Sequence, residues 1–169
     1  MNLEICEFLD WWITEDPSTS YIFEENSPDK PITDDFKNMV LIPKTTERNT
    51  IILLLPISRY EDYVYEQSLI LPLTIESLIE TIYNFYSSFI THEMFQNIPI
   101  SDDDMYYIDA KEKLSLKEPV QIYELLGSDR LPFPIIGNQR RHPLYCNGLI
   151  RFEGLEHCKE HTYKVLLGS

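Results

Sequence analysis

The stretch from Leu71 to Phe95 (LPLTIESLIETIYNFYSSFITHEMF) constrains the fold of this chain more than any other segment. Its apolar residues recur every three or four positions, which is the spacing of one face of an α-helix. Thr74 is placed to cap the N-terminus of this helix, and Thr91 is placed to cap a second, shorter helix. We therefore predict a bent helical pair with one buried face. The residues of that face are Ile75, Leu78, Ile79, Ile82, Tyr83, Tyr86, Phe89 and Ile90.

Strand-like segments lie on both sides of the helical pair. Thr50–Pro56 (TIILLLP) is a continuous apolar run, which predicts a buried strand, and Tyr63–Leu71 can pair with it. Near the C-terminus, Leu149–Leu155 and Tyr163–Leu167 flank HCKEH, a pattern that predicts a hairpin. Together these segments predict an α+β fold, a small antiparallel sheet with the central helical pair packed on one face.

Two segments between the helical pair and the hairpin are less constrained. Met105–Leu114 fits a strand or a helix, and its pattern does not separate the two. Val120–Leu126 is typical of a short strand that ends before Gly127.

Residues 1–47 differ in character from the rest. Leu3–Ile13 (LEICEFLDWWI) predicts a short helix with Ile5, Leu9, Trp12 and Ile13 on one side. Residues 14–47 contain four prolines among Ser, Thr, Asp and Glu, which predicts an irregular acidic arm. We therefore divide the chain into this helix and arm (1–47) and a single α+β domain (48–169).

The N-terminal helix has two interpretations. It can dock on the core, which is the usual fate of such apolar residues. It can also be an exposed anchor, in which Trp11 or Trp12 enters a groove of a partner protein.

The charge of the chain limits its partners. A net charge of −14 argues against nucleic acid, because affinity for a phosphate backbone comes from Lys and Arg. It fits a partner protein with basic residues. Ile51–Leu55, the most apolar run, is too short to span a bilayer, so we expect no membrane association. An odd number of cysteines and an acidic N-terminus without a signal-peptide pattern lead us to expect an intracellular protein.

The strongest candidate for chemistry is a cluster of Cys and His near the C-terminus. His142-x3-Cys146 and Cys158-x2-His161 form two close pairs, a spacing that can suit a structural tetrahedral zinc. Alternatively, His157 and His161 are exposed loop residues and Cys146 is a small buried hydrophobe. Cofactors are otherwise expected to be absent, with structural zinc as the alternative.

Support for catalysis is weak. The first 126 residues contain no glycine, so a phosphate-binding loop there is not expected. We assign no catalytic residue, and a cysteine- or metal-dependent enzyme remains an alternative because Cys146 and Cys158 have histidines nearby in sequence.

Tyrosine is abundant, with eleven residues. Tyr60, Tyr63 and Tyr65 recur at strand-like spacing, which is compatible with ordinary packing or with an adhesive protein-binding surface. With Trp11 and Trp12 they are our candidate partner-binding residues, and the hypothesis we prefer is a non-enzymatic protein–protein interaction module. A zinc-stabilised adaptor or regulatory domain is the alternative.

Three stretches also suggest a relationship. Pro72–Tyr86 followed by Phe89–Ile98, together with the ending Arg151–Ser169, resemble small uncharacterised proteins of giant nucleocytoplasmic DNA viruses (mimivirus-like). The resemblance covers about a third of the chain and carries no catalytic residue. It implies a viral protein in the host cytoplasm or the virion, either virion-associated or directed at a host factor.

Overall fold

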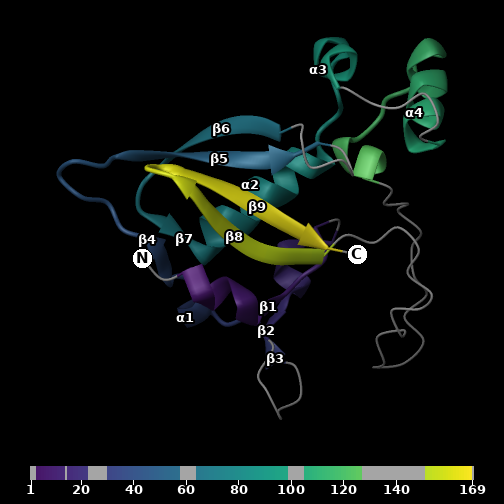
Figure 1. Cartoon of the computed structure of the whole chain (residues 1–169). Coiled ribbons are helices and arrows are strands. Elements are labelled where there is room, and N and C mark those ends of the chain that lie inside the picture. The colour runs from purple at the N-terminus through teal and green to yellow at the C-terminus, as the bar shows by residue number, and fades with distance from the viewer. Residues whose placement is uncertain are drawn as a thin grey trace.

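The computed structural model of the protein describes residues 3–13, 15–22, 30–57, 64–98, 105–126 and 151–168. It has the predicted α+β fold: a four-stranded sheet, in the order β6-β5-β9-β8, carries helix α2 on one face (Figure 1). The bounds of these elements are β5 Thr50–Pro56, β6 Val64–Ile70, α2 Ile75–Ser87, β8 Arg151–Lys159 and β9 Thr162–Gly168.

The sheet consists of two antiparallel pairs joined in its centre. β5 pairs with β6 and β8 pairs with β9, both antiparallel as predicted, but β5 and β9 run parallel. The sheet is therefore mixed and not wholly antiparallel. The two strands of each pair follow one another closely in the chain, which favours an antiparallel pair, whereas the long stretch of sequence between β6 and β8 imposes no direction between β5 and β9.

Strand β5 buries one face and leaves the other partly open. Ile51, Leu53 and Leu55 are buried in the core, and Ile52 between them is exposed. This alternation follows from the period of two along a strand, with α2 packed on the buried side. The hydroxyl of Tyr86 on α2 donates a hydrogen bond of 2.7 Å to the carbonyl of Pro56, which ties the helix to the strand inside the core.

The predicted helical pair is present. Thr74 caps α2 in a reciprocal capping box with Ser77, and Thr91 caps α3 (His92–Asn97). The predicted face is buried except at Tyr83, which is half-buried, and Phe89, which is 60% exposed. Phe89 departs from the helical pattern because α2 ends at Ser87 and the backbone becomes extended at Ser88.

The two less constrained segments are helical. Helix α4 spans Met105–Ser115, and η3, a 3₁₀-helix, spans Ile122–Leu126. The predicted strand at Val120–Leu126 is therefore wrong. The backbone of this segment bonds to the chain that follows α2 instead of to the sheet, with Ile90 N–H donating to Val120 O at 2.7 Å.

The N-terminal arm contains short elements in place of one helix. They are η1 (Leu3–Phe8), β1 (Leu9–Asp10), η2 (Pro17–Thr19), β2 (Tyr21–Ile22), β3 (Lys30–Pro31), α1 (Asp34–Lys37) and β4 (Val40–Ile42), which pairs with β7 (Leu73–Thr74). The predicted helix ends at Phe8 because β1 pairs with β2 and becomes extended. From there the buried residues alternate as in a strand, at Leu9, Trp11 and Ile13.

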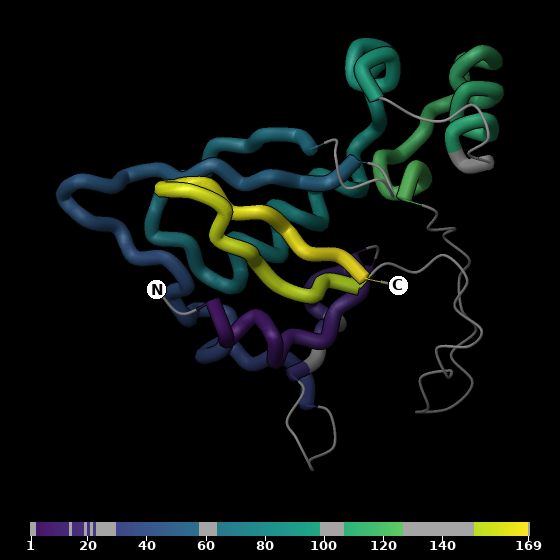
Figure 2. Tube along the Cα trace, in the orientation of Figure 1, coloured from purple at the N-terminus to yellow at the C-terminus, as the bar shows by residue number. Residues whose placement is uncertain are grey.

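The arm packs against the domain. Its buried side chains belong to the same hydrophobic core as those of the sheet and α2. Figure 2 shows the purple N-terminal segment running beside the yellow β8–β9 hairpin, and Phe152 N–H donates to Trp11 O at 3.0 Å. Within the described residues, no helix is both long and apolar enough to cross a membrane.

Candidate protein-binding groove

A groove of about 500 Å³ opens on the N-terminal arm. All of its lining residues come from the arm, namely Phe8, Ile22, Thr33, Asp35, Phe36 and Met39. Four of the six are hydrophobic, and we refer to this feature as the arm groove. An apolar depression on an exposed surface is the usual form of a binding site for an apolar side chain.

Local backbone bonds explain how the arm builds this groove. Thr33 caps the one-turn helix α1 by accepting a hydrogen bond from Phe36 N–H at 3.2 Å. Met39 N–H donates to Phe36 O at 3.1 Å, and Met39 O accepts from Ile75 N–H at the start of α2 at 3.1 Å. The backbone that carries Phe36 and Met39 is therefore anchored to the core, which leaves their side chains to form the wall of the groove.

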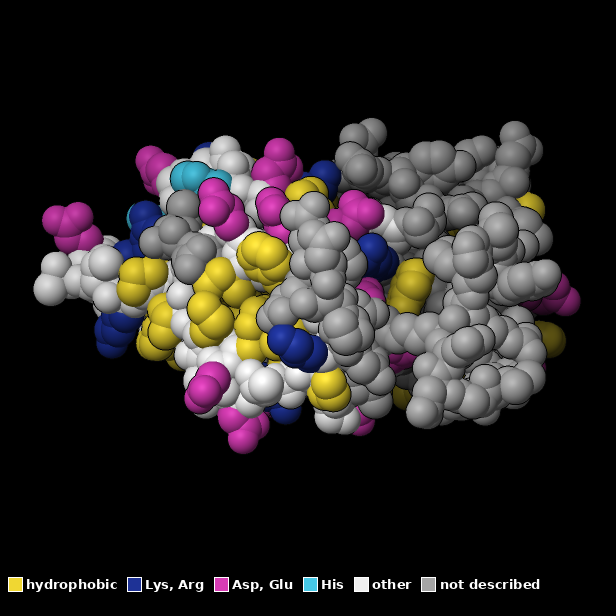
Figure 3. All heavy atoms as spheres, turned by 90° about the horizontal axis from the view of Figure 1, so that it is seen from below, with side chains coloured by type: hydrophobic (Ala, Val, Ile, Leu, Met, Phe, Trp, Pro, Cys, Tyr) yellow, Lys and Arg dark blue, Asp and Glu magenta, His cyan; other side chains and the backbone are white. Residues whose placement is uncertain are grey.

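Large hydrophobic side chains are exposed at the groove. Phe8 is 48% exposed and Met39 is 38% exposed, and Val40, which follows Met39, is 44% exposed. Figure 3, which views this side of the molecule, shows hydrophobic side chains gathered into one patch with charged side chains of both signs around it. Such a patch with a polar rim is characteristic of a protein-binding surface.

Acidic residues accompany the hydrophobic ones on the same elements. Glu4 and Glu7 are exposed on η1, and Asp34 and Asp35 are exposed on α1. Opposite charges across an interface steer association and select the partner. The charge on these two elements is therefore mainly negative, with Lys37 as the basic residue of α1.

A second hollow, of about 390 Å³, lies between η2 and α2 and is more polar. Its residues include Asp16, whose carboxylate accepts hydrogen bonds from the backbone N–H and the hydroxyl of Ser18, at 2.8 and 2.7 Å. These two bonds lower the pKa of Asp16 by stabilising its charged form. The carboxylate serves as the cap of η2, and we assign this hollow no ligand.

The structure places the two candidate tryptophans differently. Trp11 is fully buried, packs against Phe152 and donates from Nε1 to Glu15 O at 3.0 Å. It therefore cannot enter a groove of a partner in this conformation, and the anchor hypothesis is wrong for Trp11. Trp12 is half-buried, and its backbone bridges to Arg151.

Of the candidate tyrosines, Tyr65 is described and exposed on β6, where its ring stacks on Phe85 at 5.1 Å between centroids. Tyr60 and Tyr63 lie outside the described residues. In Figure 1, β6 lies across the sheet from η1 and α1, so Tyr65 is remote from the arm groove.

Two of the candidate zinc ligands lie on the β8–β9 hairpin. Cys158 and His161 are both exposed there, whereas His142 and Cys146 lie outside the described residues. Over the described ranges, no group of three or more His, Cys, Asp or Glu side chains could hold a metal ion. The other two predicted ligands lie outside the described residues, so the zinc site stays a prediction.

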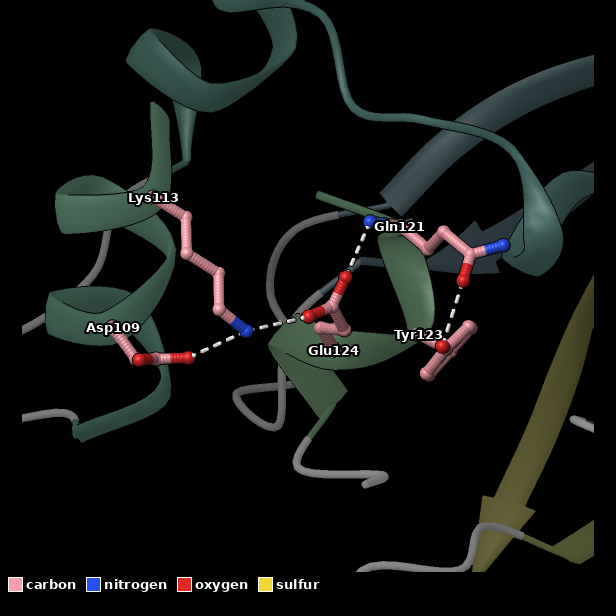
Figure 4. Close-up of polar contacts among 5 residues, drawn as sticks. All are labelled: Asp109, Lys113, Gln121, Tyr123 and Glu124. Carbon is pink, nitrogen blue, oxygen red and sulfur yellow. Dashed lines mark hydrogen bonds and ion pairs between the residues drawn. The ribbon is translucent and has the colours of Figure 1, made fainter. Parts of the chain in front are cut away.

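Two further titratable groups have structural roles. Cys6 is buried, and burial raises the pKa of its thiol to about 12, which disfavours the nucleophilic thiolate. The Lys113 ammonium donates to Glu124 at 2.9 Å and to Asp109 at 3.0 Å, and these bonds raise its pKa (Figure 4). Glu124 also accepts from Gln121 N–H, so this cluster fastens η3 to α4.

Sequence reasoning missed the groove residues. Phe8, Phe36 and Met39 are isolated apolar residues in an acidic, proline-containing arm, and they follow no helical or strand period. The available signal was Thr33 before Asp34 and Asp35, which is typical of a helix N-terminus. It could have located α1, although not the groove beside it.

Comparison of the chain with protein-family models, with curated proteins and with solved structures found no match. Function is therefore inferred from the groove, from its exposed hydrophobic side chains and from the charges around it.

Proposed function

We propose that this protein is a non-enzymatic protein–protein interaction module and that the arm groove is its binding surface. The observation that supports this most strongly is the exposure of Phe8 and Met39 in an apolar groove of a chain of net charge −14. A quarter of the residues are charged, so the chain has polar residues with which to cover such a patch. Leaving it open is best explained by a partner that covers it.

The side chains in the groove suit a protein segment. Aromatic anchors contribute a large share of binding energy at interfaces, and a methionine adapts its shape to different partners. The carboxylates on η1 and α1 favour Lys or Arg beside the apolar contact residues. The expected occupant is therefore a short amphipathic segment of another protein, with an apolar face and basic flanks.

The polar groups of the groove favour binding over chemistry. The Thr33 hydroxyl caps α1, and Asp35 is an exposed carboxylate on the same helix. Neither is paired with a base or a nucleophile among the residues that line the groove. The resemblance to proteins of giant viruses would make the partner a virion component or a host factor.

A displayed library of random peptides, selected on the wild-type protein, tests this proposal. Peptides that enrich should combine hydrophobic and basic residues, and Phe8→Ser should weaken their binding about tenfold or more, as expected for a buried aromatic anchor. Phe89→Ser is the matched control, because Phe89 is also an exposed phenylalanine and lies outside the groove.

Circular dichroism melts would establish that both variants fold. Equal binding to the wild type and to Phe8→Ser, equal losses in the two variants, or no enrichment would each contradict the proposal.

A further inference from the structure

The two edges of the main sheet differ in how well they are protected from pairing with another strand. β8, at one edge, carries the charged residues Arg151, Glu153, Glu156 and Lys159. Its pairing with β9 is interrupted twice, between Phe152 and Gly154 and between His157 and Lys159. Charges and register breaks are the features by which natural proteins prevent edge strands from associating.

The N-terminal arm covers part of the β8 edge as well. Trp12 forms a backbone bridge with Arg151, and Arg151 Nε lies 3.4 Å from Asp10 Oδ1. Figure 2 shows the arm following this side of the hairpin. The β8 edge is therefore partly occupied by the chain itself.

β6, at the other edge, has fewer of these protections among the described residues. It contains neither Lys nor Pro, and its register with β5 is continuous from Val64 to Ile70. Only Glu66 is charged in β6, and β5 has no charged residue, although a quarter of the whole chain is charged. Among the described strands, β6 pairs with β5 alone.

The register of β5 and β6 shows which backbone groups of β6 point outward. Leu71 N–H donates to Asn49 O at 2.9 Å, so Leu71 is bonded toward β5. In an antiparallel ladder this orientation recurs at every second residue. Tyr65, Gln67 and Leu69 therefore bond toward β5. The outward-facing backbone groups belong to Val64, Glu66, Ser68 and Ile70.

We propose that two copies of the chain pair antiparallel through β6, in a register centred on Gln67, so that two four-stranded sheets become one. A two-fold axis at Gln67 places Val64 opposite Ile70 and Glu66 opposite Ser68 of the second copy. All four of these residues direct their N–H and C=O groups outward, so these are the hydrogen-bonded pairs. Such an interface uses the same surface on both copies and closes after two.

The side chains of β6 fit the register centred on Gln67 better than the registers centred on the residues next to it. The centre at Gln67 sets Val64 against Ile70, and Ile70 is 79% exposed in the single copy. It also sets Tyr65 against Leu69 on the α2 side of the sheet. A centre at Glu66 would oppose two carboxylates directly, which is destabilising.

A centre at Ser68 leaves part of the strand unpaired. Val64 and Tyr65 would then lie opposite Pro72 and Leu71 of the second copy, both beyond the end of β6. Only the Gln67 register pairs the whole of β6 with itself and avoids contact between like charges.

Sedimentation equilibrium of the full chain over a range of concentrations tests for the dimer, and two variants test the strand. Ser68→Pro removes an outward N–H without removing a bond to β5, a position at which edge strands accept proline. Ile70→Lys lowers the net negative charge, so it would favour association if general repulsion were the only factor. We expect both variants to be monomeric at concentrations at which the wild type and Ser68→Ala dimerise.

A cysteine pair tests the register. In a Cys146→Ser, Cys158→Ser background, Gln67→Cys should form a disulfide-linked dimer under mild oxidation, because residues facing each other in a non-hydrogen-bonded pair lie about 4.5 Å apart at Cα. Glu66→Cys, at an exposed position one residue away, should cross-link much more slowly. Circular dichroism would establish that all variants fold.

Several results would overturn the proposal: a wild type that stays monomeric, dimers that survive in both Ser68→Pro and Ile70→Lys, or equal cross-linking at positions 66 and 67. The arm groove is a separate surface, so a failure here would leave the proposed function intact. Phe8→Ser should still dimerise, and Ile70→Lys should still bind the selected peptides.

Discussion

The arm groove and the β6 edge are both exposed apolar surfaces, but they offer a partner different chemical groups. At the groove, the backbone of Phe36 and Met39 is already hydrogen-bonded to the arm and to α2. We therefore propose that a partner contacts mainly side chains there. At the β6 edge, alternate residues direct their backbone N–H and C=O groups away from β5. Glu66 is the one charged side chain of this strand.

This difference implies two kinds of recognition. A groove of side chains selects a partner by the shape and charge of its residues, which suits a heterologous protein. A strand edge gains its affinity from main-chain hydrogen bonds, which any extended strand can make, so the register of side chains determines the partner. The partner that we propose for β6 is β6 of a second copy.

Trp11→Ala should have the largest effect of these changes, because it should lower both the free energy of unfolding and peptide binding at the arm groove. Trp11 is fully buried where the arm meets β8, so we expect a loss of about 3–5 kcal/mol in the free energy of unfolding. Peptide binding at the groove should fall with it, because the arm carries every groove residue. Urea unfolding measures the first effect and peptide titration the second. Trp12→Ala, at a half-buried position, is the control and should cost about 1 kcal/mol or less.

Thr74→Ala should moderately destabilise helix α2, which supports both the arm groove and β6. Thr74 caps α2, and its neighbour Ile75 bonds to Met39 of the groove, while Phe85 on the same helix stacks on Tyr65 of β6. Loss of a cap hydroxyl costs about 1 kcal/mol. Thr91→Ala, which removes the cap of the short helix α3, should cost less and leave the groove unchanged. A smaller loss for Thr74→Ala than for Thr91→Ala in urea unfolding would contradict this assignment.

Cys6 should make the docking of the arm sensitive to alkaline pH. The pKa of its thiol is raised by burial from 9.0 to about 12, so the unfolded chain ionises first. The stability that the neutral thiol supports is complete below pH 9 and is lost as the pH rises toward 12. We expect a loss of about 0.8 kcal/mol at roughly half a pH unit above the ordinary thiol pKa.

Urea unfolding at neutral and alkaline pH measures this loss, and Cys6→Ala should lack it. Cys158→Ala leaves Cys6 in place and should keep the wild-type pH dependence. Identical pH profiles for the wild type and Cys6→Ala would show that the thiol plays no part.

Salt should produce the smallest effect, with opposite signs at the two surfaces. Dimerisation brings together two chains of net charge −14, so screening of their repulsion should strengthen it about threefold between low and physiological ionic strength. Binding of a basic peptide to the groove should weaken by a similar factor over the same range. Sedimentation and peptide titration at both ionic strengths would measure these changes. If salt changed dimerisation and peptide binding in the same direction, the two surfaces would not differ as proposed.

Much of the fold could be predicted because its signals are local. The period of α2, the cap at Thr74, the apolar run of β5 and the hairpin around HCKEH each depend on residues close together in the chain. The failures arose where distant residues decide the conformation. η1 ends at Phe8 because β1 finds β2 as a partner, and η3 replaces a predicted strand because its backbone bonds to the end of α2.

The candidate sites were harder to predict. Trp11 and Trp12 are neighbours of the same type, and only the extended backbone of this segment turns Trp11 into the core. The arm groove collects residues from η1, β2 and α1, and no motif marks such a set in the sequence. The scarcity of charge in β5 and β6, where Glu66 is the one charged residue, was in contrast visible in the sequence, although its meaning depends on which strand lies at the edge.

The sequence by itself determined the central helix with its cap, the two antiparallel pairs and the acidic balance of the chain, because periodicity, capping and charge need only neighbouring residues. The tertiary structure decided the parallel contact of β5 with β9, the burial of Trp11, the position of the arm groove and the exposure of the β6 edge. These features depend on contacts between residues far apart in the chain. The free energies of such contacts are comparable with one another, and the contacts leave no pattern within any one segment of the sequence.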